Sequence, residues 1–223
     1  MSSAHVFAPG HLTGLFQICI DLEDPLKTGA RGSGISLTDG VHTRVKVESS
    51  RKPSHSIYIN GEEMIDANVS ENVLSKYLSM IHEPYNILIH HTIETPITAG
   101  FGSSGGGAIS LSLALNKAMD TGLSRTEASQ LAHVAEIECK TGLGSVFAAD
   151  HGGFGVLYEP GAPGIGAGVL MEDPSGLEVI YLYFGPIHTK KALSNPELIV
   201  KINQIGGSYV DELHGDLTQE RFL

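Results

Sequence analysis

A glycine- and serine-rich segment that leads directly into an apolar segment is the feature that most constrains the fold of this chain. Residues 96–107 include five glycines and two serines, and residues 108–116 have the composition of a buried helix. The first backbone N–H groups of a helix lack partners within the helix, and the helix dipole places partial positive charge at that end. A glycine loop that opens a helix is therefore predicted to bind phosphate.

The residue types in this loop support that prediction, although a structural explanation is also available. Glycine lets the backbone approach a ligand closely, and the hydroxyl groups of Ser103 and Ser104 can contact phosphate or Mg²⁺. The alternative is a tight turn whose small residues serve only close helix packing. The spacing excludes a P-loop, which ends in Gly-Lys-Ser/Thr, while Gly100-x-Gly102-x-x-Gly105 fits the weak pattern of a dinucleotide-binding loop only formally.

The composition indicates a globular protein with a net negative charge. The chain has 223 residues, of which 41% are hydrophobic and 17% charged, as in ordinary proteins of one large or two small domains. A formal net charge of -11 argues against partners such as nucleic acid or anionic membranes, which need a basic surface, but it permits a local basic pocket for an anionic substrate. Two cysteines are too few for a disulfide framework, and no signal peptide or membrane-spanning apolar run is recognisable. We therefore expect a cytoplasmic protein without nucleic-acid or membrane partners, and whether it forms a homodimer is left open.

Local sequence patterns predict an alternation of strands and helices. Pro9 and Gly10 are expected to form a turn between strands at 5–8 and 12–20, followed by a loop at 21–34. Further strands are expected at 41–47, 56–59, 86–89, 151–158 and 179–184, and helices are expected to start at Asn68 and Ser124 and to span 196–205.

The helix that starts at Ser124 carries two candidate acidic residues, Glu136 and Glu138. Residues two apart on a helix point in different directions, so only one of these carboxylates can face a site. The alternative for either residue is a solvated charge on the helix surface. The eleven histidines are spread along the chain without cysteine or carboxylate partners at ligand spacing, which argues against a zinc site.

The glycine loop resembles the second conserved motif of the GHMP kinases, Pro-x-x-x-Gly-(Leu/Phe)-Gly-Ser-Ser-(Gly/Ala), at position 96 and throughout 100–105. In that family the loop wraps the phosphates of ATP, and the residue that corresponds to Ser104 helps to hold Mg²⁺. The resemblance implies nucleotide contacts from Pro96, Gly100, Phe101, Gly102, Ser103, Ser104, Gly105, Gly106 and Gly107.

Further segments resemble the archaeal-type pantoate kinases, a family within the GHMP kinases, over most of the chain. These segments are 5–16, 29–34, 132–136, 141–144 and 152–153. The resemblance implies an α+β fold: a GHMP kinase-like N-terminal domain, similar to domain 2 of ribosomal protein S5, packs on a second α+β domain. ATP and substrate then occupy the cleft between the domains.

We expect these domains to span 1–160 and 161–223, because the glycine- and proline-rich stretch 159–168 is the clearest break in the sequence. Family members continue to a third glycine-containing motif, which this chain lacks before Leu223. The comparison with the family therefore predicts a shortened or divergent chain, in which the second domain is incomplete.

The resemblance also implies a reaction and roles for individual residues. The reaction is transfer of a phosphoryl group from ATP to the primary hydroxyl of pantoate, which gives 4-phosphopantoate, a step towards coenzyme A. Glu136 is expected to hold Mg²⁺ together with Ser104, and His11, Thr13 and Arg31 are expected to contact the substrate. A solvated loop arginine is the alternative for Arg31.

The catalytic base is the point at which this sequence departs from the family. The family pattern Thr-Gly-Leu-Gly-Asp supplies an aspartate as the base, and Ser145 occupies that position here. Asp150 is the nearest replacement, so Ser145 and Asp150 are the two candidate catalytic residues. Five residues along a helical turn would point Asp150 about 140° away from Ser145, which disfavours it unless the segment is irregular.

These observations favour a Mg²⁺- and ATP-dependent kinase whose substrate is pantoate. Two alternatives remain open at this stage: a nucleotide-binding protein of the GHMP fold without catalytic activity, and a GHMP kinase for another hydroxy acid or alcohol, such as homoserine or mevalonate. The residues alone do not distinguish among these substrates.

Overall fold

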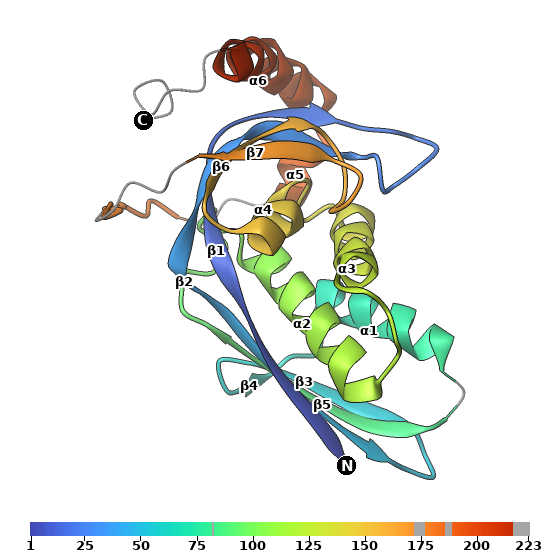
Figure 1. The fold of residues 1–223 in the computed structure, drawn as a ribbon. Coiled ribbons are helices and arrows are strands. Elements are labelled where there is room, and N and C mark those ends of the chain that lie inside the picture. Colours follow the sequence, from blue (N-terminus) through green and yellow to red (C-terminus); the bar gives the residue numbers. More distant parts are fainter. Residues whose placement is uncertain (82, 172–176, 186–188, 216–223) are drawn as a thin grey trace.

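The computed structural model describes residues 1–81, 83–171, 177–185 and 189–215, with no side-chain description for 191–192. It contains a seven-stranded mixed sheet with helices packed against it (Figure 1). The strands are β1 Ser2–Cys19, β2 Gly29–Ser49, β3 Ser54–Ile59, β4 Glu62–Glu63, β5 Tyr85–Ile93, β6 Phe154–Glu159 and β7 Ala167–Met171. The helices are α1 Asn68–Met80, α2 Ser103–Met119, α3 Arg125–Cys139, α4 Ser145–His151, α5 Thr189–Leu193 and α6 Pro196–Gly215.

Strand β2 organises the sheet because it has partners along both edges. One edge pairs with β1 along its length, while the other pairs antiparallel with β5 over 41–49 and with β6 over 32–35. The order along the sheet is β4-β3-β5-β2-β6-β7, with β1 on the remaining edge of β2. The expected loop at 21–34 is therefore too long, since 29–34 belongs to β2.

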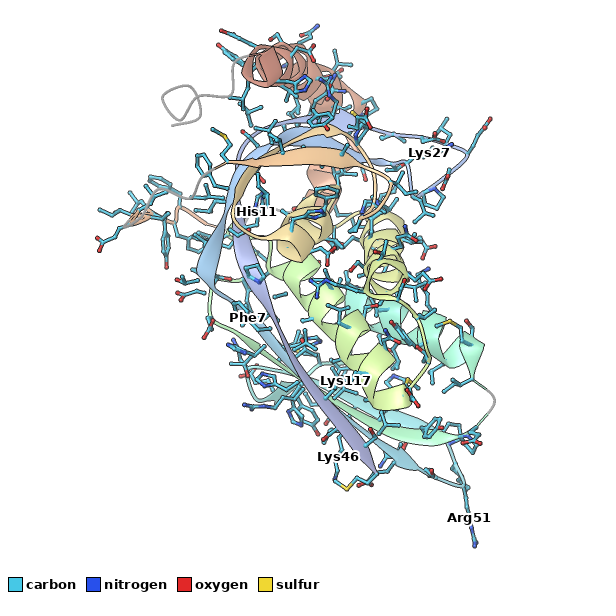
Figure 2. All side chains as sticks on the ribbon, viewed as in Figure 1. Phe7, His11, Lys27, Lys46, Arg51 and Lys117 are labelled. Carbon is cyan, nitrogen blue, oxygen red and sulfur yellow. The ribbon has the colours of Figure 1, made fainter. Side chains whose placement is uncertain are left out.

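The predicted turn at Pro9-Gly10 is wrong, because β1 continues through these residues as one strand with a register shift. Figure 2 shows Phe7 and His11 on the same continuous strand. The physical reason is the residue that pairs with Pro9, Gly40 of β2, where a Cβ would lie 2.1 Å from the carbonyl oxygen of Ala8. Because Gly40 has no side chain, the two backbones can come this close and form a bulge, and a bulge tolerates a proline, which has no N–H group.

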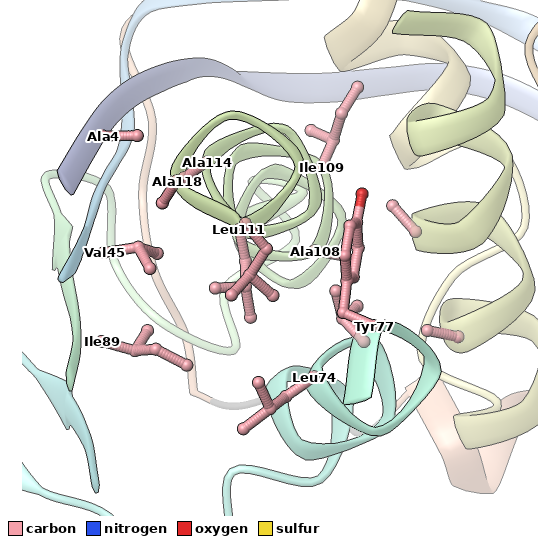
Figure 3. Packing of buried hydrophobic residues seen from close by; sticks show 14 of the residues in the cluster. Ala4, Val45, Leu74, Tyr77, Ile89, Ala108, Ile109, Leu111, Ala114 and Ala118 are labelled. Atoms are coloured by element: carbon pink, nitrogen blue, oxygen red, sulfur yellow. The ribbon is translucent and has the colours of Figure 1, made fainter. Parts of the chain in front are cut away.

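Helix α2 forms the centre of the hydrophobic core, as the apolar segment predicted. Figure 3 shows Leu111 and Ala114 of α2 among side chains from the sheet and from α1. Two of its serines, Ser110 and Ser112, are buried as well, and Ser112 Oγ donates to the Ala128 carbonyl at 2.6 Å and lies 2.9 Å from the Tyr77 hydroxyl. Helix α2 packs against α1, α3, β1 and β2, and these contacts fix the position of its N-terminus.

The helices expected to start at Asn68, Ser124 and Pro196 begin within a residue of these positions, whereas the helix expected over 108–116 begins five residues earlier, at Ser103. Ser124 and Glu127 form the predicted capping box, with the Glu127 N–H donating to Ser124 Oγ at 3.2 Å and the Ser124 N–H to Glu127 Oε2 at 2.8 Å. Asn68 is the first residue of α1 rather than its cap, since Ala67 is at the N-cap position.

The last part of the chain differs most from expectation. Helix α6 extends ten residues beyond its predicted end at Ile205 to Gly215 and packs on β1, where the Asn203 amide bonds the backbone N–H and C=O of Ile18. The predicted strand at 179–184 is wrong, because these residues have no regular secondary structure. Strand β7 lies beyond position 160 and pairs with β6 in the same sheet. Within the described residues, no helix has the length and hydropathy needed to cross a bilayer.

Candidate active site

A cavity of about 620 Å³ lies beside the start of α2. This volume is typical of a site for a small molecule. Of the predicted site residues, His11, Thr13, Arg31, Gly100, Gly102 and Ser145 line the cavity. Its walls come from β1, β2, the glycine loop, the segment 141–145, α4, β6, β7, α5 and α6.

The glycine loop opens α2, as the sequence predicted. Gly100 and Gly102 have φ values of 85° and 65°, a conformation that favours glycine, and Gly102 is the N-cap of α2. The next N–H groups have no acceptor within the helix and are available to a ligand. At Gly105, a Cβ would lie 2.6 Å from Cβ of Ser145, so this glycine lets α4 pack against the first turn of α2.

The other loop residues have structural contacts as well. Ser103 Oγ lies 3.1 Å from Thr95 Oγ1, and the buried Phe101 packs edge-on against Tyr181, with the ring centroids 4.8 Å apart. The Phe101 carbonyl accepts a hydrogen bond from the backbone N–H of His11 at 2.9 Å. This bond ties β1 to the loop and places His11 next to the start of α2.

The carboxylate of Glu136 is buried at the start of α2, with the side chain only 2% exposed. Its Oε1 accepts hydrogen bonds from Ser104 Oγ and from Thr141 Oγ1, the latter at 2.6 Å, and its Oε2 accepts one from Ser145 Oγ at 3.0 Å. Burial raises the pKa of Glu136, and the three hydroxyl donors offset only part of this effect. No basic side chain of the described residues forms an ion pair with it.

Glu138 has a different environment on the same helix. Its exposed carboxylate accepts hydrogen bonds from Lys76 Nζ at 2.8 Å and Asn72 Nδ2 at 2.9 Å. Only Glu136 therefore faces the start of α2, in agreement with the geometric argument that the two carboxylates cannot share a site.

The residues around Glu136 fit a divalent cation that prefers oxygen ligands. A buried carboxylate without a basic partner gains from a cation, and the hydroxyls of Ser104, Thr141 and Ser145 add oxygen atoms nearby. The described residues contain no group of three or more His, Cys, Asp or Glu side chains that could hold a metal without help. One carboxylate, hydroxyls and phosphate oxygens are instead the kind of set that Mg²⁺ uses.

The structure separates the two candidate bases. Ser145 begins α4 and lines the cavity, whereas Asp150 is not among the lining residues. The Asp150 carboxylate lies 2.8 Å from Arg125 Nη2 and accepts a hydrogen bond from Ser129 Oγ at 3.1 Å, so it faces α3. Helical geometry within α4 places it on another face from Ser145. The assignment of Asp150 as a base is therefore not supported by the geometry.

Arg31 lines the cavity, but its guanidinium already has three partners. Nε donates to the Tyr158 carbonyl at 2.8 Å, Nη1 donates to Gln17 Oε1 at 3.0 Å, and Nη2 pairs with Asp211 of α6. Arg31 is therefore a strand residue that joins β1, β6 and α6, not a solvated loop residue. To hold a substrate anion, it would have to exchange one of these partners.

His11 lies where β1 passes the glycine loop. A Cβ at Gly102 would lie 3.2 Å from Cβ of His11, and a Cβ at Gly34 would lie 2.3 Å from its Cε1. The imidazole is thus seated on Gly34, with its Nδ1 buried and without a hydrogen-bond partner among the described residues. Removal from bulk water lowers the pKa of His11 to about 4, so the ring is neutral at pH 7.

Sequence reasoning missed three residues near the site, Thr141, Gly142 and His151. Thr141 binds Glu136, and a Cβ at Gly142 would lie 2.0 Å from Glu136 Oε2, so only glycine leaves room for the carboxylate. Both residues belong to a segment with a recognisable pattern, which could have identified them. His151 lines the cavity from the end of α4, stacked on Phe147, and no sequence signal distinguished it.

The glycine loop, the buried carboxylate and the adjoining cavity are the features expected of a GHMP kinase, and the comparison with known proteins assigns the chain to that class. The family described as GHMP kinases N terminal domain matches residues 67–153. The chain is 33% identical to a pantoate kinase of Methanocaldococcus jannaschii, over 98% of this chain and 76% of the relative. It is 31% identical to a pantoate kinase of Thermococcus kodakarensis, over 97% of this chain and 71% of the relative. The chain belongs to the pantoate kinase family.

A comparison of folds agrees with this assignment. A solved structure described as a phosphotransferase related to the CoA biosynthesis pathway superposes with a TM-score of 0.83 and 27% identity, covering 100% of this chain and 72% of the other. The predicted α+β fold of the GHMP type and the predicted family are therefore confirmed.

Proposed function

We propose that this protein transfers the γ-phosphoryl group of ATP to the primary hydroxyl of pantoate and releases 4-phosphopantoate and ADP. The observation that carries the proposal is the buried carboxylate of Glu136 next to the free N–H groups at the start of α2. Phosphoryl transfer depends mainly on positioning and on neutralising charge, which the N–H groups and a cation held by Glu136 would supply.

The start of α2 is the proposed site for the ATP phosphates. The loop and the first residues of α2, from Gly100 to Gly105, would surround them with backbone N–H groups, and the helix dipole favours their negative charge there. Ser104 and Glu136 would hold Mg²⁺ together with phosphate oxygens. When bound, this ion would neutralise charge on the transferred group.

The proposed position of pantoate is the part of the cavity lined by His11, Thr13 and Ser145. The cavity is lined by residues before position 160, such as Ser145, and by residues after it, such as Gly168 and Ile202. We therefore keep domains 1–160 and 161–223 as a proposal, with the substrate between them. The carboxylate of pantoate would approach Arg31, in exchange for part of its contact with Asp211.

One specific observation favours a second function, that of a nucleotide-binding protein without turnover. None of the described residues lining the cavity carries a carboxylate, and Ser145 stands where the family has an aspartate. A nucleotide-binding protein without turnover would have the same cavity and the same glycine loop.

An ADP-release assay across four acceptors tests these functions. ATP and Mg²⁺ are supplied with pantoate, homoserine, mevalonate or shikimate, and product is identified by mass spectrometry. We expect ADP release with pantoate well above that with the other three. Preference for another acceptor would replace the substrate, whereas ATP binding without ADP release would favour the nucleotide-binding protein.

A further inference from the structure

The cavity contains few groups that could take a proton from a substrate hydroxyl. Among the described lining residues there is no Asp, Glu, Lys, Cys or Tyr, and the titratable side chains are those of His11, Arg31 and His151. Arginine stays protonated in proteins and cannot act as a base. A serine hydroxyl such as that of Ser145 is not a proton acceptor at neutral pH without a base beside it, and its partner here is the Glu136 carboxylate that the proposed Mg²⁺ would use. Only the two imidazoles remain.

The two imidazoles differ in their position relative to the start of α2. His151 ends α4, six residues beyond Ser145; its ring is stacked on Phe147, and its Nδ1 donates to the Phe147 carbonyl at 3.0 Å. His11 is bonded through its backbone to the glycine loop and touches the N-cap of α2. His11 is therefore the imidazole at the end of the cavity where the phosphates of ATP would lie.

The environment of His11 leaves the tautomer of its ring unfixed. Nδ1 is buried without a hydrogen-bond partner among the described residues. The ring is seated on Gly34, where any side chain would collide with it. With a pKa lowered to about 4, His11 is neutral at pH 7 and its basicity is close to that of an aspartate, whose ordinary pKa is about 3.9.

We propose that His11 is a catalytic residue that accepts the proton of the attacking hydroxyl, in the role that an aspartate has elsewhere in the family. The hydroxyl oxygen forms a bond to the γ-phosphorus, the bond from that phosphorus to the bridging oxygen of ADP breaks, and the hydroxyl proton moves to an imidazole nitrogen of His11. The imidazolium returns the proton to water after the products leave. This inference rests on the proposed kinase function.

The test compares His11→Asn with a matched variant, His5→Asn. Both substitutions remove an imidazole from β1, but His5 is exposed and outside the cavity. We expect kcat with pantoate to fall about 10²- to 10⁴-fold in His11→Asn. The KM for ATP and the thermal shift caused by Mg²⁺·ATP should stay close to wild type in both variants, and His5→Asn should keep its kcat.

Chemical rescue separates a proton acceptor from a structural residue. In His11→Ala, added imidazoles should restore turnover, and the gain should increase with the pKa of the added imidazole. A wild-type kcat in His11→Asn would overturn the role of His11 and leave the kinase function standing. Loss of kcat without rescue, or rescue that does not depend on pKa, would overturn it as well. Absence of ADP release by the wild-type protein with every acceptor would overturn both.

Discussion

Replacing Glu136 by glutamine should remove the contribution of Mg²⁺ to nucleotide binding while the fold remains intact. The amide keeps the shape of the carboxylate and can still accept hydrogen bonds from Ser104 and Thr141, but it lacks the charge that a divalent cation requires. Mg²⁺·ATP at about 100 times its Kd should stabilise the wild-type protein by about 2.7 kcal/mol. For a chain of 223 residues, this corresponds to a rise in Tm of about 5 to 11 °C.

The variant should lose most of this stabilisation. If the substitution weakens binding about 100-fold, the stabilisation at the same ligand concentration falls to about 0.4 kcal/mol, and the rise in Tm to less than about 2 °C. Differential scanning calorimetry with and without Mg²⁺·ATP measures both values. Glu138→Gln is the matched control, because it makes the same chemical change two residues away on a carboxylate bound to Lys76. A full shift in Glu136→Gln, or its loss in Glu138→Gln, would refute the assignment.

Without ligand, Glu136→Gln should also remove a pH-dependent component of stability. Burial raises the pKa of Glu136 above its ordinary value of 4.5, so between the two pKa values the folded protein binds more protons than the unfolded chain. The contribution to stability is fully present below 4.5 and is lost as the pH rises through the folded-state pKa. Urea unfolding across this range should show the decline in the wild-type protein and not in the variant.

Four further substitutions test individual contacts. Ser104→Ala should reduce the thermal shift caused by Mg²⁺·ATP, because the variant lacks the hydroxyl that lies at the start of α2 and donates to Glu136. Gly142→Ala should destabilise the protein by about 1 to 3 kcal/mol in urea unfolding, because its Cβ would overlap Glu136 Oε2. Ser145→Asp should lower Tm without Mg²⁺, since it adds a carboxylate beside Glu136, and added Mg²⁺ should restore it. Asp150→Asn should lower Tm through its contacts with Arg125 and Ser129 while kcat stays near wild type; collapse of kcat would return Asp150 to the list of bases.

The features that the sequence predicted correctly depend on residues close together in the chain. The glycine loop and the apolar helix that follows it are adjacent, and the capping box from Ser124 to Glu127 spans four residues. The separation of Glu136 from Glu138 follows from the helical repeat alone. Short-range geometry of this kind is set by backbone dihedral angles, which the local residue types restrict directly.

The features that the sequence predicted wrongly depend on distant partners. The pair Pro9-Gly10 has the composition of a turn, but pairing with β2 near Gly40 keeps it in a strand. Residues 179–184 are a continuous run of apolar and aromatic residues typical of a strand, yet a strand needs a neighbour for its backbone groups, and none of the described strands pairs with them. Residue types alone cannot say whether such a neighbour exists.

The amino-acid sequence by itself determined the family, the glycine loop at the start of α2 and the choice of Glu136 over Glu138 as one of two carboxylates that cannot share a site. Only the tertiary structure decided that Asp150 faces Arg125, that Arg31 is held by Asp211 from α6, and that Nδ1 of His11 is buried beside the loop without a hydrogen-bond partner among the described residues. The reason is that the charge and hydrogen bonding of a side chain depend on its neighbours in space. For Arg31 and Asp211 those neighbours are 180 positions apart in the chain, beyond the reach of any local pattern.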